Sequence, residues 1–133
     1  GITCKIEEDI EAAVWRKYIL NCAYNVITAY YSANTADLRS NPQAVEEFKI
    51  MLEEGCLVAR TKGIQISPKL EEQLLSHMLT KQDPASTSSL NRDFLTGREN
   101  ELEIFSGELL AMAAEVGLEL PMTQRFYQEL SQR

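Results

Sequence analysis

Long hydrophobic runs are absent from this sequence, because Lys, Asn or Glu interrupts each apolar stretch well before the roughly 20 residues that a membrane-spanning helix needs. The start, ITCKIEED, lacks the basic and then apolar order of a signal peptide. Basic residues number 13 against 20 acidic ones, and the net charge of −7 repels a nucleic-acid backbone. We therefore expect a cytoplasmic protein that binds neither membranes nor nucleic acid.

Clusters of metal-binding residues are also absent. The three cysteines, Cys4, Cys22 and Cys56, lie far apart, and the single histidine, His77, stands at ligand spacing from none of them. Cys22 and Cys56 fall among apolar helical residues, as free thiols do in the core of a protein from a reducing compartment. The sequence therefore predicts no metal site.

Strand patterns and a glycine-rich phosphate-binding turn are missing as well. No GxGxxG follows a strand, so the chain cannot hold a dinucleotide by itself. Apolar residues instead recur at helical spacing, and 133 residues with 44% hydrophobic content suit one domain with a real core. We predict an all-α fold of about six helices in a compact bundle over 1–133.

The first half of the chain contains three of the predicted helices. A long helix is expected over 7–32, which contains neither Gly nor Pro, and the polar segment 34–42 is expected to be a loop or short turn. Pro42 suits the first turn of a second helix, which ends at Gly63. Ser67, followed by proline, is the expected cap of a third helix.

The second half contains shorter predicted helices. The turn-rich segment 83–89 is expected to be a loop leading into a short helix that ends near Gly97. Asn100 and Glu103 have the spacing of a capping box and predict the start of the next helix. Pro121 predicts the start of the last one.

Polar residues interrupt the long apolar helix at one spacing. In WRKYILNCAYN, Lys17, Asn21 and Asn25 recur every fourth residue, and positions four apart on a helix differ by only about 40°. One interpretation is a solvated face, or amides that bind neighbouring helices. The other is the wall of a binding site, in which the amides hold a small polar ligand and Lys17 supplies a proton or a charge.

A second group of polar residues follows in STSSLNRDF and RENELE. Hydroxyls at a helix start, such as that of Ser89, lie beside free backbone N–H groups and the positive end of the helix dipole, where a carboxylate or phosphate binds. The alternative is that these serines are plain helix caps. Glu101 falls in the turn after Asn100, where an acidic residue is common for helix stability alone.

These segments together resemble the C-terminal domain of the ketopantoate reductase (2-dehydropantoate 2-reductase) family over essentially the whole chain. The resemblance implies a helical bundle like those of ketopantoate reductase and phosphogluconate dehydrogenase-like proteins. It is carried by the opening GI with a later DI, WRKYILNCAYNVITA, ARTKGI, SSLNRDFLTGRENELEIFSGELL and VGLELPMTQRFYQEL.

The resemblance implies a role for each candidate residue. Lys17 is implied to be the general acid that protonates the substrate carbonyl oxygen, and Asn21 and Asn25 to bind substrate oxygens. Ser89 is implied to contact the substrate carboxylate. Glu101 is implied to meet the nicotinamide ribose and to support Lys17, so it belongs to both the catalytic and the cofactor-binding residues.

The resemblance further implies an NADPH-dependent reductase that converts a 2-oxo acid to the 2-hydroxy acid, in pantothenate biosynthesis if the acid is ketopantoate. NADP would be held mainly by an N-terminal Rossmann domain that this chain lacks, so 1–133 would be the C-terminal substrate and catalytic domain, inactive alone. Ser86 stands where the family often has Asn, which leaves another branched 2-oxo acid open. The expected partners are the 2-oxo acid, the N-terminal domain and a second copy in a homodimer.

An interaction module is the alternative function from a different class. In that case the chain would be a free-standing helical domain without catalytic activity, whose exposed apolar surface binds a partner or a second copy.

Overall fold

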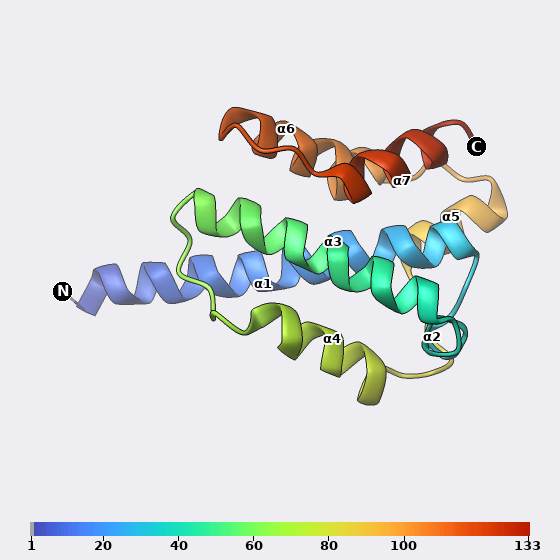
Figure 1. The fold of residues 1–133 in the computed structure, drawn as a ribbon, viewed down its shortest axis with the longest axis horizontal. Coiled ribbons are helices and arrows are strands. Elements are labelled where there is room, and N and C mark those ends of the chain that lie inside the picture. Colours follow the sequence, from blue (N-terminus) through green and yellow to red (C-terminus); the bar gives the residue numbers. More distant parts are fainter. Residues whose placement is uncertain (1) are drawn as a thin grey trace.

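The computed structural model describes residues 2–133, with side chains described from residue 4 on, and all of its regular elements in this range are helical (Figure 1). The all-α prediction is confirmed, with seven α-helices and one π-helical segment in place of about six helices. The elements are α1 (Ile2–Tyr31), α2 (Thr35–Arg39), α3 (Pro42–Thr61), α4 (Leu70–Thr80), α5 (Ser89–Thr96), the π-helix η1 (Glu103–Gly107), α6 (Glu108–Glu115) and α7 (Pro121–Ser131). Among these residues, none of the helices is both long and apolar enough to cross a bilayer.

The long helix α1 is the element around which the others are arranged. In Figure 1 it passes between α4 on one side and α6 and α7 on the other, and its N-terminal part extends beyond them. It begins five residues before the predicted start, and Ile6, Ile10 and Val14 in its N-terminal part are exposed. Its second half is buried, with Ile19 and Ile27 in the core.

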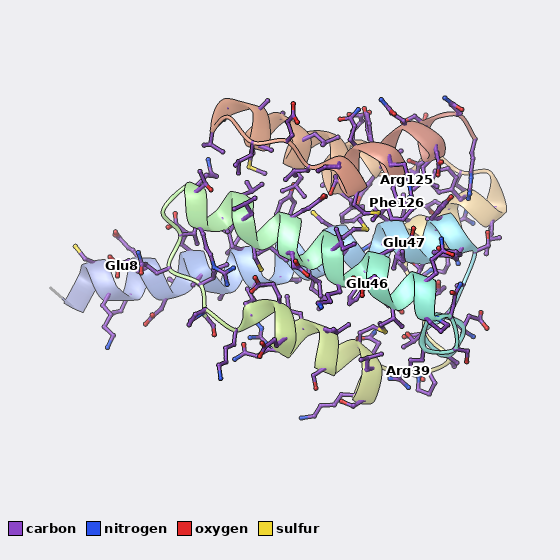
Figure 2. The ribbon with its side chains drawn as sticks, viewed as in Figure 1. Glu8, Arg39, Glu46, Glu47, Arg125 and Phe126 are labelled. Carbon is purple, nitrogen blue, oxygen red and sulfur yellow. The ribbon has the colours of Figure 1, made fainter. Side chains whose placement is uncertain are left out.

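The segment predicted to be a loop or short turn contains α2, so that prediction was wrong. Asn34 and Asp37 form a complete capping box, in which each side chain accepts a hydrogen bond from the backbone N–H of the other. This cap stabilises a helix of only five residues. Arg39 at its end donates to the carbonyl of Met78 at 2.9 Å, which ties α2 to the end of α4 (Figure 2).

Helix α3 has the predicted bounds within two residues, and Gly55 in its middle lets it approach α1 closely. A Cβ at this position would lie 3.1 Å from the Cγ2 atom of Ile19. The predicted cap of the third helix was wrong, because α4 begins at Leu70 with Lys69 as its N-cap residue. Ser67 instead accepts the backbone N–H of Lys69 at 3.2 Å, in the turn before the helix.

The capping box predicted at Asn100 is only half formed. The Asn100 side chain accepts the backbone N–H of Leu102 at 3.1 Å, but the Glu103 carboxylate accepts a hydrogen bond from the Tyr127 hydroxyl. The helix then opens with the wide π turn η1 before it continues as α6. The predicted short helix is confirmed as α5, and Gly97 ends it with the left-handed φ of 69°.

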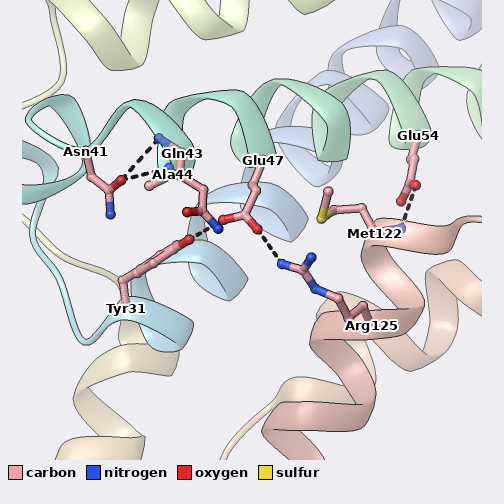
Figure 3. Close-up of polar contacts among 8 residues, drawn as sticks. All are labelled: Tyr31, Asn41, Gln43, Ala44, Glu47, Glu54, Met122 and Arg125. Carbon is pink, nitrogen blue, oxygen red and sulfur yellow. Dashed lines mark hydrogen bonds and ion pairs between the residues drawn. The ribbon is translucent and has the colours of Figure 1, made fainter.

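Two buried carboxylates of α3 fasten α7 to the bundle (Figure 3). Glu47 accepts hydrogen bonds from Tyr31 of α1 and Arg125 of α7. Burial and the bond to Glu47 raise the pKa of the Tyr31 hydroxyl, while Glu47 raises the pKa of Arg125. The Tyr31 phenol is therefore neutral and the Arg125 guanidinium charged at neutral pH.

The second carboxylate, that of Glu54, caps α7 from outside the helix. It accepts the backbone N–H groups of Met122 at 2.9 Å and Thr123 at 2.8 Å, and the Thr123 hydroxyl at 2.7 Å. The N-cap residue Leu120 has no side-chain oxygen for this purpose.

Substitution of Glu54 by alanine is expected to lower the free energy of unfolding by about 2 kcal/mol, because it leaves donors at the start of α7 unpaired. Chemical denaturation of this chain measures the change. The matched control is Glu53→Ala, one residue away and exposed, which is expected to change stability by less than about 0.5 kcal/mol. Equal losses in the two variants would contradict the capping role of Glu54.

Candidate functional site

A polar hollow of about 380 Å³ lies where the second half of α1 meets the start of α5. We call it the amide hollow. It brings together three of the predicted site residues, Asn21, Asn25 and Ser89, although the serine is more than 60 positions from the amides in the sequence. The full lining is Leu20, Asn21, Tyr24, Asn25, Gln82, Thr87, Ser88, Ser89, Arg92 and Phe105.

Asn25 uses its carboxamide to join α1 to α5. Its Nδ2 donates to the carbonyl of Asn21 at 2.9 Å, and its Oδ1 accepts from the Ser89 hydroxyl and from the Leu90 N–H, both at 3.3 Å. The residue is 7% exposed, so these bonds satisfy a buried amide. The bonds from Ser89 and Leu90 match the alternative in which the amide binds a neighbouring helix, and the contact of Asn25 with a substrate oxygen stays a prediction.

Ser88, not Ser89, caps α5. Its hydroxyl accepts the backbone N–H of Asn91 at 3.1 Å and lies 2.6 Å from the hydroxyl of Thr28 in α1. The backbone N–H of Leu90 donates to Asn25, so two N–H groups at the start of α5, those of Leu90 and Asn91, already have acceptors within the chain. The helix start alone is consequently a weaker anion site than the sequence pattern predicts.

Arg92 supplies the positive charge of the amide hollow, and the sequence reasoning gave it no role. It is exposed and lies three residues after Ser89, so both side chains occupy one face of α5. A guanidinium binds a carboxylate with two parallel hydrogen bonds, which a serine hydroxyl cannot do. The spacing of Ser89 and Arg92 was the available signal.

Asn21 is half-buried beside this charge. Unlike Asn25, its carboxamide is not tied to other protein groups in residues 4–133 and borders the open space of the amide hollow. An amide that offers both a donor and an acceptor to such a space can bind a ligand oxygen.

Lys17 lies one turn before Asn21 and borders an adjacent, smaller hollow of about 260 Å³. We call this the lysine hollow, and its lining is Ala13, Arg16, Lys17, Leu20, Leu74 and His77. Leu20 belongs to both hollows, so the ammonium and the amides occupy neighbouring recesses along α1. Lys17 is exposed, and in the described part of the chain it forms no ion pair.

Glu101 lies outside both hollows. It is exposed, in the segment between α5 and η1, and its carbonyl accepts the backbone N–H groups of Ile104 at 3.0 Å and Phe105 at 3.2 Å. Phe105, one of these two donors, lies in η1 and borders the amide hollow. The predicted support of Lys17 by Glu101 is not among the ion pairs of residues 4–133 and stays a prediction.

The buried thiols take no part in these hollows. Cys22 and Cys56 are 3% and 0% exposed, as the sequence predicted, and burial raises the pKa of each thiol to about 12. They are therefore protonated at neutral pH and are poor nucleophiles. Across the described residues, His, Cys, Asp and Glu side chains form no cluster of three that could hold a metal ion.

Comparison with known proteins places this helical bundle among larger reductases. The chain is 30% identical over 127 residues to the 2-dehydropantoate 2-reductase of Yersinia pestis, covering 94% of this chain and 40% of that protein. It therefore spans less than half of the length of this relative.

Solved structures show the same fold. The dimeric ketopantoate reductase of Staphylococcus aureus matches with a TM-score of 0.84 at 24% identity, over 92% of this chain and 42% of that one. D-mandelate dehydrogenase, in a ternary structure with NADH and anilino(oxo)acetate, matches with a TM-score of 0.79 at 18% identity, over 90% of this chain and 39% of that one.

The match to a protein family covers nearly the whole chain. The family described as "Ketopantoate reductase PanE/ApbA C terminal" matches residues 9–133, which include both hollows and all of the predicted site residues. The chain therefore belongs to the ketopantoate reductase family and corresponds to the C-terminal domain of its members.

Proposed function

We propose that this chain is the substrate and catalytic domain, residues 1–133, of an NADPH-dependent reductase that converts a 2-oxo acid to a 2-hydroxy acid. The observation that carries the proposal is the amide hollow, which joins Asn21, Asn25 and Ser89 to the cation Arg92, next to Lys17. A 2-oxo acid has a carboxylate and a carbonyl on adjacent carbons. It therefore needs a cation and a proton donor in neighbouring positions.

The named relatives support this substrate class. The Yersinia pestis relative is a 2-dehydropantoate 2-reductase, and the D-mandelate dehydrogenase structure contains NADH and anilino(oxo)acetate. The same helical fold thus serves enzymes for different 2-oxo and 2-hydroxy acids. Ketopantoate is the first candidate substrate, which would place the enzyme in pantothenate biosynthesis, and another branched 2-oxo acid is the second.

Each side chain then has a chemical role. Arg92 and Ser89 hold the substrate carboxylate, while Asn21 donates a hydrogen bond to a substrate oxygen. Asn25 binds a substrate oxygen in exchange for its bond to Ser89, or keeps Ser89 in place. Lys17 donates a proton to the carbonyl oxygen, and a reduced nicotinamide, when bound, would supply the hydride for the carbonyl carbon.

The cofactor requires a second domain in this proposal. Among the described residues no strand exists to form the strand–turn–helix unit that binds a dinucleotide, so only a margin of the cofactor site can lie here. Glu101, exposed near Phe105, is the residue of this chain proposed to meet the nicotinamide ribose. An N-terminal Rossmann domain is proposed to bind NADP and to cover Lys17.

The complete protein is expected to oxidise NADPH only when a branched 2-oxo acid is added, as followed by the loss of NADPH absorbance. The 133-residue chain alone is expected to be inactive and, by calorimetry, to bind NADPH no more tightly than about millimolar, because it lacks the phosphate-binding turn. Micromolar binding of NADPH by the chain alone would refute the divided site. No turnover of any branched 2-oxo acid by the complete protein would refute the function.

One observation favours the alternative of an interaction module. Ile6, Ile10 and Val14 are 53%, 59% and 60% exposed and repeat every fourth residue on the N-terminal part of α1. At about 100° per residue, this stripe shares a face of the helix with Lys17 and Asn21. Both the reductase and the interaction module need a partner surface that covers this apolar stripe. The two functions differ because the interaction module predicts that the complete protein does not oxidise NADPH.

A further inference from the structure

Positive charge collects in a groove between α1 and α4, although the chain has a net charge of −7. The groove measures about 420 Å³ and is lined by Arg16 of α1, by Lys69, His77 and Lys81 along α4, and by Glu72. Glu72 is the one carboxylate in this lining. We call this site the basic groove, and its volume is within the range of about 300 to 1,000 Å³ typical of small-molecule sites.

The cations of the basic groove have no carboxylate partners. The ion pairs in residues 4–133 are Arg60–Glu71 and Glu47–Arg125, and both lie elsewhere. Arg16 donates only to the amide oxygen of Gln73, at 3.4 Å, across the groove. Neighbouring cations repel one another, the single carboxylate of Glu72 offsets only part of this repulsion, and a bound anion would reduce it further.

The position of Lys69 at the start of α4 does not stabilise the helix. It is the N-cap residue of α4 and makes no capping bond, and the dipole at a helix start disfavours a cation. Lys81, at the C-cap, is favoured by the same dipole. The two residues lie at opposite ends of α4, about 18 Å apart along a helix that rises about 1.5 Å per residue. An anion that meets both ammonium groups must carry several charges, and the flexible lysine side chains must reach toward it from the two ends of the helix.

The basic groove also opens beside the proposed reaction site. Arg16 and His77 belong to the lining of both the basic groove and the lysine hollow. A ligand in the groove would therefore lie next to Lys17 without occupying the amide hollow.

We propose that the basic groove binds the phosphate chain of an extended small molecule, either a nucleoside triphosphate or a free oligophosphate. Oligophosphates carry several negative charges along a short chain, which matches cations spread along α4, whereas a single carboxylate can meet only one end. The proposal goes beyond the reductase function and does not depend on it, because binding can be measured directly on this chain.

Calorimetric titration of the 133-residue chain with inorganic tripolyphosphate, at constant ionic strength, tests the site. The wild type is expected to bind with a dissociation constant of about 1 mM or lower. The double variant Lys69→Gln/Lys81→Gln is expected to bind about tenfold more weakly, and Glu72→Gln about twofold more tightly. The matched control, Lys49→Gln/Lys62→Gln, removes the same charge from exposed positions on and next to α3 and is expected to stay within twofold.

A second arm with ATP separates the two sources of the phosphate chain. Affinity for ATP at least about threefold above that for tripolyphosphate supports a nucleotide, and equal affinity supports the phosphate chain alone. Absence of tripolyphosphate binding in the millimolar range overturns the proposal. Equal weakening in both double variants also overturns it, since the attraction would then be diffuse. The Glu72→Gln variant keeps the test decisive if the double variant fails to fold, because unchanged affinity in it counts against the site.

Discussion

Replacement of Lys17 by methionine in the complete protein is expected to reduce kcat by about two to four orders of magnitude, the range for loss of a general acid. Methionine keeps an unbranched apolar chain but removes the ammonium, so a side chain of similar length still lines the lysine hollow. KM for the 2-oxo acid is expected to change only a few-fold, since the carboxylate is bound elsewhere. Steady-state kinetics of NADPH oxidation measures both constants.

Two further measurements separate general acid catalysis from a structural effect of the Lys17 substitution. Added methylamine is expected to restore part of the lost turnover, because a small ammonium ion can enter the space left by the side chain and donate the proton. The control Lys49→Met removes an exposed amine from α3 and is expected to leave kcat unchanged within about twofold. A Lys17→Met enzyme with wild-type kcat would contradict the assigned role.

Most of the fold could be predicted from the sequence, because long helices have two independent signals. The apolar spacing and a glycine or proline at the boundary agree for α3 and α7, and the structure confirms both helices. The helix α2 was missed because it has only five residues, too few for a period to show. Its Asn34 and Asp37 capping box was the one available signal.

The π turn η1 could not be predicted in the same way. A single wide turn contains an extra residue and rotates the later residues of the helix around its axis. In the sequence, the only sign of this rotation is that the apolar residues fit the 3.6-residue spacing of an α-helix less well. Phe105, Leu109 and Met112 share one apolar spacing in the sequence, but only Leu109 is fully buried, while Phe105 and Met112 are partly buried.

The candidate site was predictable where one helix places several residues in register. Spacing alone put Asn21 and Asn25 on one side of α1, and both border the amide hollow. Spacing could not show that Asn25 is already bonded to the start of α5, since that contact joins residues more than 60 positions apart. Arg92 was overlooked because a single arginine on a helix is common, and its meaning comes only from the hollow that it borders.

The largest change in substrate affinity is expected from Arg92. Substitution by leucine in the complete protein should raise KM for the 2-oxo acid by about 10- to 100-fold, the value of roughly 1.5 to 3 kcal/mol for a hydrogen-bonded ion pair. The effect on kcat should be small, because the proton donor and the carbonyl are untouched. Arg92→Lys should lie between the wild type and the leucine variant, since it keeps the charge but loses the two-pronged geometry. Steady-state kinetics with varied 2-oxo acid gives these values.

The substrate itself provides the control for Arg92. The primary amide of the same 2-oxo acid has no carboxylate, so the wild type and Arg92→Leu should reduce it with kcat/KM values within about threefold of each other. Arg98→Leu removes an exposed arginine just after α5 that does not border the amide hollow, and KM should stay within about twofold. Equal losses on the acid and on the amide would assign Arg92 to the structure of α5. A loss confined to the acid would show that Arg92 binds the substrate carboxylate. This contact would then hold the substrate with its carbonyl facing Lys17.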